Sequence, residues 1–199
     1  MPVEIPESLT QRLQGLGPHL VKVANKGKEP FEKGWQKPEN LMNAADLRLQ
    51  RWLAEGGNYG VAGGFGLVIL DADVPEIKQL VKERLPSTFT VESPGSGGWH
   101  CYYLCGLEKP IRLRDEDGEN VGDVQGPGKM VVGPGSIHPN GGIYKIVNDG
   151  ALARVTKQQL VDALSDYVVP EKEVLQIEAT ARKEKSFTGV DLDILQVVP

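Results

Sequence analysis

Glycine and proline divide this sequence into short apolar segments, and no other feature limits its possible folds as strongly. The 199 residues include 24 glycines and 14 prolines, above the typical frequencies of about 7% and 5%. Long helices are disfavoured because both residues interrupt them, whereas short strands joined by turns are favoured. With 40% hydrophobic and 25% charged residues, the composition excludes a disordered, collagen-like or coiled-coil chain. We therefore expect an α+β fold with many short strands.

The length predicts one domain, either alone or with a short appendage. We place the domain at residues 1–170, and the remaining 171–199 are expected to be a charged C-terminal tail or linker. No stretch approaches the roughly 20 consecutive apolar residues of a membrane helix, and the first residues lack the pattern of a signal peptide. We therefore expect a cytoplasmic protein with no membrane partner.

The spacing of apolar residues predicts helices and strands in alternation. The expected helices are Glu7 to Leu16, Asn40 to Glu55 with Asn40 as N-cap, Pro75 to Leu85 and Thr156 to Tyr167. The expected strands are Tyr59 to Ala62, Leu67 to Asp71, Thr88 to Glu92, Trp99 to Cys105, Asn120 to Val124, Lys129 to Val132 and Ile143 to Val147. Cys101 and Cys105 would lie about 13 Å apart along one strand, too far for a disulfide.

The strongest candidate for chemistry is the apolar strand LVILDADV, which ends in Asp71 and Asp73. Because side chains alternate along a strand, these two carboxylates project to the same side. They repel one another unless a cation lies between them, and oxygen ligands suit Mg²⁺ or Mn²⁺. The alternative is structural: Asp71 ends the strand, and Asp73 caps the helix that follows.

A glycine turn, PGSGG, delivers His100 to the start of another strand. Glycines leave room and free backbone N–H groups for phosphate oxygens, and an imidazole can donate to a phosphate. The alternative is a structural histidine. A zinc site formed by His100, Cys101 and Cys105 is disfavoured because their spacing fits no usual zinc finger.

Asp123 lies inside a short apolar strand, where a carboxylate needs a partner or an ion unless it is exposed at a sheet edge. Further along, a Gly/Pro loop carries Ser136 and His138 and leads to the next strand, as a functional loop or a simple hairpin. The glycines of GVAGGFG are not followed by Lys-Ser/Thr, which excludes a Walker P-loop. They also precede a strand, which excludes a Rossmann fingerprint.

The order of these motifs resembles the primase–polymerase domain of the archaeo-eukaryotic primase superfamily. In particular, the chain is similar to the bifunctional DNA primase/polymerases of plasmids, phages and integrated elements. The resemblance covers about Val21 to Val147. It rests on the following segments, in order: Lys28-Glu29-Pro30, Trp35, NYGV, LVILDAD, SPGSGGWHCYY, GDVQGPGKMVVGPGS and GGIY. It implies an RRM-like catalytic core, a mixed or antiparallel β-sheet with flanking helices.

The resemblance also implies roles for single residues. Asp71, Asp73 and Asp123 match the acidic motifs that hold two divalent ions, Mg²⁺ or Mn²⁺, and His100 matches the histidine that contacts the nucleotide phosphates. Further nucleotide-binding candidates are Lys28, Ser136, Ser96, Gly97 and Gly98. Some relatives carry a zinc-binding insert, but the segment between Cys105 and Asn120 lacks its cysteines and histidines, so no structural zinc is expected.

The implied enzyme is a template-dependent nucleotidyltransferase, a DNA primase/polymerase that extends a 3′-hydroxyl with nucleoside triphosphates during replication of a mobile element. Its partners would be single-stranded or primed DNA, nucleoside triphosphates, and a helicase domain or protein. The net charge of −5 leaves nucleic-acid contact to local lysines between Val21 and Lys37, with Trp35 as a stacking platform, unless this segment is a solvated loop. Two other functions stay open: a metal-dependent glycosyltransferase of DxD type, and a noncatalytic nucleic-acid-binding module.

Overall fold

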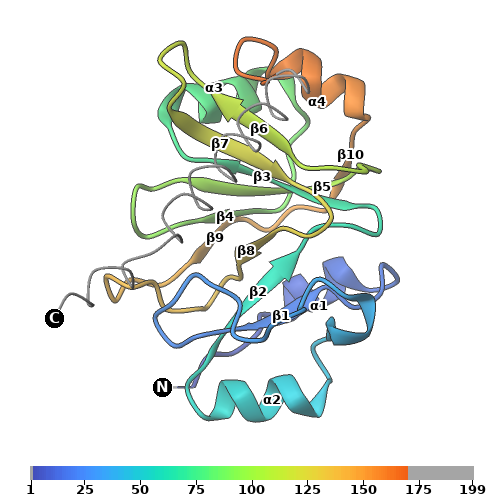
Figure 1. The fold of residues 1–199 in the computed structure, drawn as a ribbon, viewed down its shortest axis with the longest axis vertical. Coiled ribbons are helices and arrows are strands. Elements are labelled where there is room, and N and C mark those ends of the chain that lie inside the picture. The colour runs from blue at the N-terminus through green and yellow to red at the C-terminus, as the bar shows by residue number, and fades with distance from the viewer. Residues whose placement is uncertain (1, 170–199) are drawn as a thin grey trace, which may run out of the picture. The chain divides into compact units, whose positions relative to one another are not determined.

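Two β-sheets organise the part of the chain that the computed structural model describes, residues 2–169 (Figure 1). The expected tail at 171–199 lies outside the described residues, and the domain boundary near residue 170 stays a prediction. None of the described helices is long and apolar enough to cross a membrane.

The described residues form four α-helices, one short 3-10 helix and ten strands. The helices are α1 (Glu7–Leu13), η1 (Pro38–Asn40), α2 (Leu47–Ala54), α3 (Pro75–Arg84) and α4 (Lys157–Ala163). The strands are β1 (Leu20–Val23), β2 (Asn58–Ala62), β3 (Leu67–Ala72), β4 (Thr90–Glu92), β5 (Trp99–Leu104), β6 (Ile111–Arg114), β7 (Asn120–Gln125), β8 (Met130–Val132), β9 (Lys145–Asn148) and β10 (Ala153–Arg154).

The smaller sheet has the strand order β1-β2-β8, and the larger has the order β6-β7-β3-β5-β4-β9. All of these neighbours are antiparallel, whereas β10 joins β5 in parallel. The prediction of an α+β fold with a mixed sheet and flanking helices is confirmed. In Figure 1, α3 and α4 lie at one end of the molecule and α1 and α2 at the other, with the larger sheet between them.

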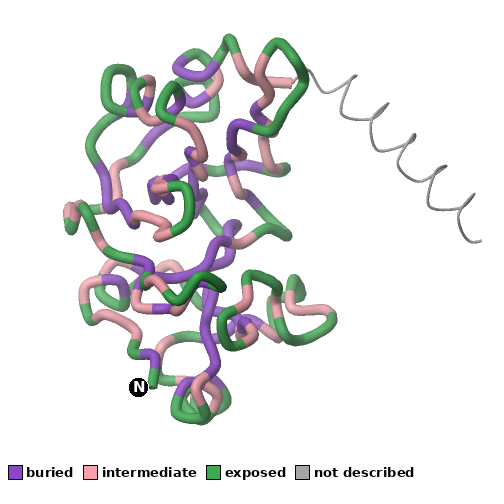
Figure 2. The backbone as a smooth tube through the Cα atoms, turned by 90° about the vertical axis from the view of Figure 1, so that its left-hand side faces the viewer, coloured by how far each residue is buried: buried purple, intermediate pink, exposed green. Residues whose placement is uncertain are grey.

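Strand β3 shows how the larger sheet is buried on both faces. Its residues alternate between two apolar clusters, as the period of two along a strand requires. Leu67 and Ile69 belong to a cluster shared with the smaller sheet and α1, whereas Val68 and Leu70 belong to one shared with α3 and α4. Figure 2 shows buried segments of the chain in the middle of the molecule and exposed segments at its periphery.

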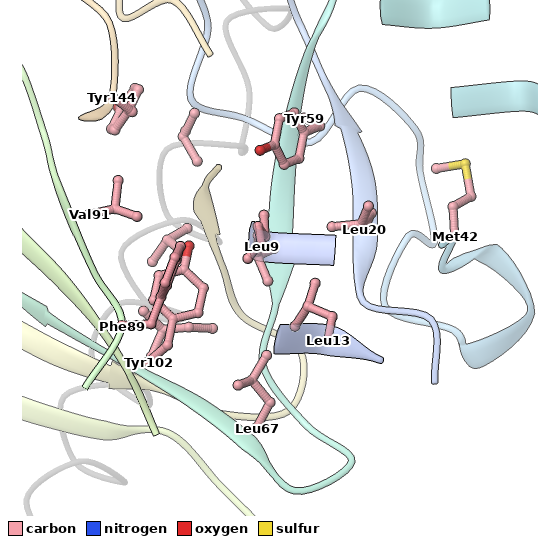
Figure 3. Packing of buried hydrophobic residues seen from close by; sticks show 14 of the residues in the cluster. Leu9, Leu13, Leu20, Met42, Tyr59, Leu67, Phe89, Val91, Tyr102 and Tyr144 are labelled. Atoms are coloured by element: carbon pink, nitrogen blue, oxygen red, sulfur yellow. The ribbon is translucent and has the colours of Figure 1, made fainter. Parts of the chain in front are cut away.

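The first cluster joins the two sheets. Figure 3 shows Phe89, just before β4, and Tyr102 of β5 on one side and Tyr59 and Leu20 of the smaller sheet on the other, with Leu9 of α1 between them. Phe89 and Tyr102 pack edge to face, with ring centroids 5.3 Å apart. This packing fixes the smaller sheet against one face of the larger, so loops of both can contribute to one site.

The expected helix from Asn40 to Glu55 is wrong in its first half. Met42 instead pairs with Leu20 of β1: each backbone N–H donates to the carbonyl of the other at 2.8 Å. The helix begins only at Leu47, with Asp46 as N-cap accepting from the Arg48 N–H. Burial of Met42 against the core outweighs the helical propensity of this segment.

Two other features of the fold bear on the sequence analysis. No strand was expected between Cys105 and Asn120, but β6 (Ile111–Arg114) lies there and pairs with β7. Cys101 and Cys105 are both free and buried, and burial raises the pKa of the Cys101 thiol to about 12.

Candidate active site

Two carboxylates and a histidine lie side by side on three adjacent strands of the larger sheet. Asp71 on β3 is the direct partner of Asp123 on β7 and, on its other side, of His100 on β5. Directly opposed Cα atoms in antiparallel strands are about 4.5–5.5 Å apart. We refer to Asp123, Asp71 and His100 as the cross-strand row. By alternation, the row faces the smaller sheet, as Ile69 does.

Asp123 owes its place in the row partly to the residue before it. A Cβ on Gly122 would lie 2.3 Å from the Asp71 carbonyl oxygen, and Gly122 has a φ of +151°. Only glycine allows β7 to approach β3 this closely with that backbone conformation. On the outer side, Arg112 of β6 is the direct partner of Asp123.

Asp73 lies just beyond the end of β3, where its N–H donates to the Val121 carbonyl at 3.2 Å. A Cβ on Gly98 would lie 3.3 Å from the Asp73 Oδ1, so this carboxylate is next to the turn formed by residues 94–98, which we call the glycine turn. The cross-strand row and the glycine turn are therefore adjacent, with Asp73 between them.

The three carboxylates share one electrostatic environment. Burial, together with the smaller effects of the negative charges of Asp73 and Asp123, raises the pKa of Asp71 to about 8, while Lys28 opposes the shift. Burial also raises the pKa of Asp73 and of Asp123. A site that holds negative charge at this cost favours a cationic ligand.

His100 is buried beside Asp71, with its Nε2 3.5 Å from the Asp71 Oδ1. Burial lowers the pKa of His100 to about 4, so the ring is neutral at neutral pH. It stacks on Tyr144, with ring centroids 5.6 Å apart. The ring is therefore held by packing against Tyr144 and by a hydrogen bond with the Val132 backbone.

The glycine turn is fixed by hydrogen bonds at both ends. The Ser93 N–H donates to the Gly98 carbonyl at 2.8 Å, and the Gly98 N–H donates to the Ser96 hydroxyl at 3.3 Å. Lys78 of α3 donates from its Nζ to the Gly97 carbonyl at 3.1 Å and lies 5.6 Å above the Trp99 ring centroid. A helix on the opposite side of the sheet thus supports the turn.

The two remaining sequence candidates come from the smaller sheet and its loops. Lys28 is exposed but close enough to lower the pKa of Asp71 and Asp73. The Ser136 side chain is fully buried: its hydroxyl donates to the Tyr59 carbonyl at 3.3 Å and accepts from the Tyr59 N–H at 3.4 Å. Its contact with a nucleotide stays a prediction, and the hydroxyl here fixes a loop.

The sequence analysis missed the roles of Lys78 and Tyr144. Tyr144 is part of the GGIY segment that supports the family resemblance, but the resemblance gave this residue no role. No sequence pattern indicated a role for Lys78, because its contact with Gly97 joins a helix to a turn 19 residues away.

The donor chemistry of the site fits a divalent cation: three carboxylates, one of them with a pKa raised to about 8 by burial and by the other two, prefer hard cations. Within residues 2–169, however, no group of three or more His, Cys, Asp or Glu side chains is close enough to hold a metal ion. The carboxylates are coupled by charge without a common coordination geometry.

The raised pKa of Asp71 predicts how metal-free stability depends on pH. From pH 6.5 to 8, Asp71 keeps its proton in the folded state and loses it in the unfolded state. The folded state then binds more protons, so the free energy of unfolding falls as pH rises, by up to about 2 kcal/mol. His100 contributes only between about pH 4 and 6.5, with the opposite sign.

Chemical denaturation in a chelator at half-unit pH steps measures this fall, and Asp71→Asn is expected to flatten the curve between pH 6.5 and 8. A wild-type curve that is already flat in this interval would contradict the raised pKa.

Comparison with known proteins identifies the family of the chain. No curated protein matches the chain significantly. The family model described as "Bifunctional DNA primase/polymerase, N-terminal" (Prim-Pol) matches residues 11–162. This match covers most of the chain and includes the cross-strand row, Asp73 and the glycine turn. The chain therefore belongs to the Prim-Pol family of bifunctional DNA primase/polymerases.

Proposed function

We propose that this chain is a template-dependent nucleotidyltransferase that extends a 3′-hydroxyl with nucleoside triphosphates during replication of a plasmid, phage or mobile element. Membership of the Prim-Pol family supports a DNA primase/polymerase function in general. The observation that carries the proposal is the cross-strand row, because it puts Asp71 and Asp123 opposite each other beside a neutral histidine.

Family members generally use divalent metals. In our proposal Asp71, Asp73 and Asp123 would hold two Mg²⁺ or Mn²⁺ ions. Bound ions of this kind lower the pKa of an attacking hydroxyl and neutralise charge on the phosphates. The chain's own contribution is to hold Asp71 opposite Asp123 on adjacent strands, with Asp73 just beyond the end of β3, despite their repulsion. The burial that raises the pKa of Asp71 also strengthens its attraction to a cation.

The other residues would bind and orient the triphosphate. His100 is neutral and held by Tyr144, so it can donate a hydrogen bond to a phosphate oxygen without the cost of burying a charged ring. Gly97 offers a backbone N–H and Ser96 a hydroxyl in the turn next to Asp73, whereas Gly98 would have to release its N–H from the Ser96 hydroxyl to bind a phosphate. Lys28 adds a positive charge from the loop that follows β1. Preorganised donors of this kind stabilise charge as it develops.

Primed DNA is the proposed template partner, with a helicase domain or protein as a further partner. Because the net charge is −5, DNA contact depends on local positive charge. Besides the lysines between Val21 and Lys37, Arg114, Lys129 and Arg112 lower the pKa of Asp123, so positive charge also surrounds the outer end of the row. A primer strand that crosses the sheet at β6 would contact these positively charged side chains.

Primer extension tests the proposal. The full chain is incubated with a primed template, labelled nucleoside triphosphates and either Mg²⁺, Mn²⁺ or a chelator. We expect elongation that follows the template sequence and requires metal. Release of nucleotide from a sugar nucleotide without primer elongation would instead indicate the glycosyltransferase. DNA binding with neither reaction would indicate the noncatalytic module.

Lys78 provides a prediction about the support of the glycine turn. Lys78→Met keeps the apolar stem over Trp99 but removes the donor to the Gly97 carbonyl. Because the turn would lose one fixed point, we expect the KM for nucleotide to rise about tenfold with kcat nearly unchanged. Steady-state extension kinetics measure the two constants. Lys82→Met is the matched control, since Lys82 also lies over Trp99 and is exposed; an equal effect of both variants would contradict the role of Lys78.

A further inference from the structure

His138 is a buried histidine, 8% exposed, in the loop between β8 and β9. Its Nδ1 accepts a hydrogen bond from the Asn140 N–H at 3.2 Å. A neutral imidazole has one donor and one acceptor nitrogen, so the accepting Nδ1 places the proton on Nε2. The ring therefore presents Nε2–H as a donor.

This donor has no partner. The Nε2 of His138 is buried and makes no hydrogen bond to any other residue within 2–169. A buried donor without an acceptor is unfavourable, and each such group in a folded protein calls for an explanation. A ligand that brings a hydrogen-bond acceptor to this nitrogen would be such an explanation.

The unpaired Nε2 of His138 lies against the glycine turn. A Cβ on Gly95 would come within 3.1 Å of the His138 Nε2, and Gly95 itself is exposed. The loop that carries His138 is also bound to the turn by Asn140, whose Nδ2 donates to the Pro94 carbonyl at 3.0 Å. The loop and the turn thus form one unit, and because Gly95 has no side chain, no side chain of this residue fills the space next to Nε2.

His138 is linked to the histidine of the row, His100, through Tyr144. Tyr144 contacts both rings, with centroid distances of 5.6 Å to His100 and 5.7 Å to His138. Tyr144 thus connects the two rings, and the unpaired Nε2–H of His138 calls for a ligand with an acceptor atom at the glycine turn.

We propose that His138 is a second phosphate-binding histidine of this site, with its Nε2–H donating to an oxygen of the nucleotide triphosphate at the glycine turn. The inference rests on the proposed function, because it takes the same nucleotide as its ligand. A phosphate oxygen suits the role because hydrogen bonds to anionic acceptors are the stronger ones.

Two variants separate the donor from the structure of the loop. His138→Asn keeps an acceptor near the position of Nδ1 for the Asn140 N–H but lacks a donor at the position of Nε2. His138→Gln places an amide donor near Nε2 instead. The probe is inorganic tripolyphosphate, which competes with a fluorescent nucleoside triphosphate for the metal-loaded full chain, with Tm measured alongside.

We expect His138→Asn to weaken tripolyphosphate binding at least about tenfold with the Tm kept, and His138→Gln to remain within about threefold of wild type. Wild-type affinity in His138→Asn would overturn the inference. Equal weakening in both variants, with or without a lower Tm, would overturn it too, because the position of the donor would then not matter.

Primer extension by the wild-type chain keeps this inference separate from the proposed function. Tripolyphosphate binding that depends on His138, in a chain that does not extend primers, would refute only the proposed function. Primer extension together with unchanged tripolyphosphate binding in His138→Asn would refute only the role of His138.

Discussion

Asp71→Asn is expected to lower nucleotide incorporation at least about 10³-fold while leaving the protein as stable as the wild type or more stable at pH 8. The substitution removes the central charge of the cross-strand row, between Asp123 and His100. It also removes a carboxylate whose ionisation opposes folding, since burial raises its pKa to about 8. Loss of activity with a gain in stability is the pattern of a functional residue held at a cost to the fold.

Primer extension and thermal unfolding at pH 8 measure the two effects. Glu116→Gln is the matched control, because Glu116 is an exposed carboxylate in the β6–β7 turn and its loss should change neither activity nor Tm. Incorporation by Asp71→Asn within tenfold of wild type would exclude Asp71 from the reaction centre. A lower Tm at pH 8 would show that the Asp71 carboxylate stabilises the fold.

Gly133→Ala is expected to cost about 3 kcal/mol of folding free energy, at the upper end for overpacking of a core. A Cβ at this position would lie 2.2 Å from the ring of Tyr59. That ring cannot move easily, because it is fully buried and its hydroxyl donates to the Pro134 carbonyl at 2.6 Å. The clash falls on the loop that Ser136 also fixes.

Urea denaturation measures this loss. Gly106→Ala serves as the control, because no heavy atom lies within 4 Å of its Cβ position and its φ lies outside the left-handed region; we expect a change below about 0.5 kcal/mol. A loss below 1 kcal/mol in Gly133→Ala would mean that Tyr59 and its loop shift to accept the methyl group.

Much of the fold follows from local patterns in the sequence. The apolar run before Asp71 and the glycines before His100 mark strands unambiguously, because burial on both faces leaves few alternatives to a central strand. The helix from Pro75 also follows from a local pattern, because a proline at its first turn and the spacing of its apolar residues both indicate a helix. The structure of such elements is determined by residues close in sequence, so it can be predicted from one sequence.

The features of the structure that could not be predicted from the sequence depend on contacts between residues distant in sequence. Met42 is extended because of its pairing with Leu20, and nothing near residue 42 encodes that contact. The same holds for the register that aligns Asp71 with Asp123 and for the contact of Lys78 with Gly97. Ser136 was a nucleotide candidate from its motif alone, whereas its burial against Tyr59 appears only in three dimensions.

The alignment of the row across three strands also determines where the chain tolerates a change in length. One residue inserted within β3, β5 or β7 would turn the side chains beyond it to the opposite face of the sheet, towards α3 and α4. The β6–β7 turn is different, because its residues 116–119 are exposed and a register shift already separates it from the row, between Leu113 and Arg114. Insertions and deletions between His100 and Asp123 are therefore expected to accumulate at this turn during evolution, while the strands keep their lengths.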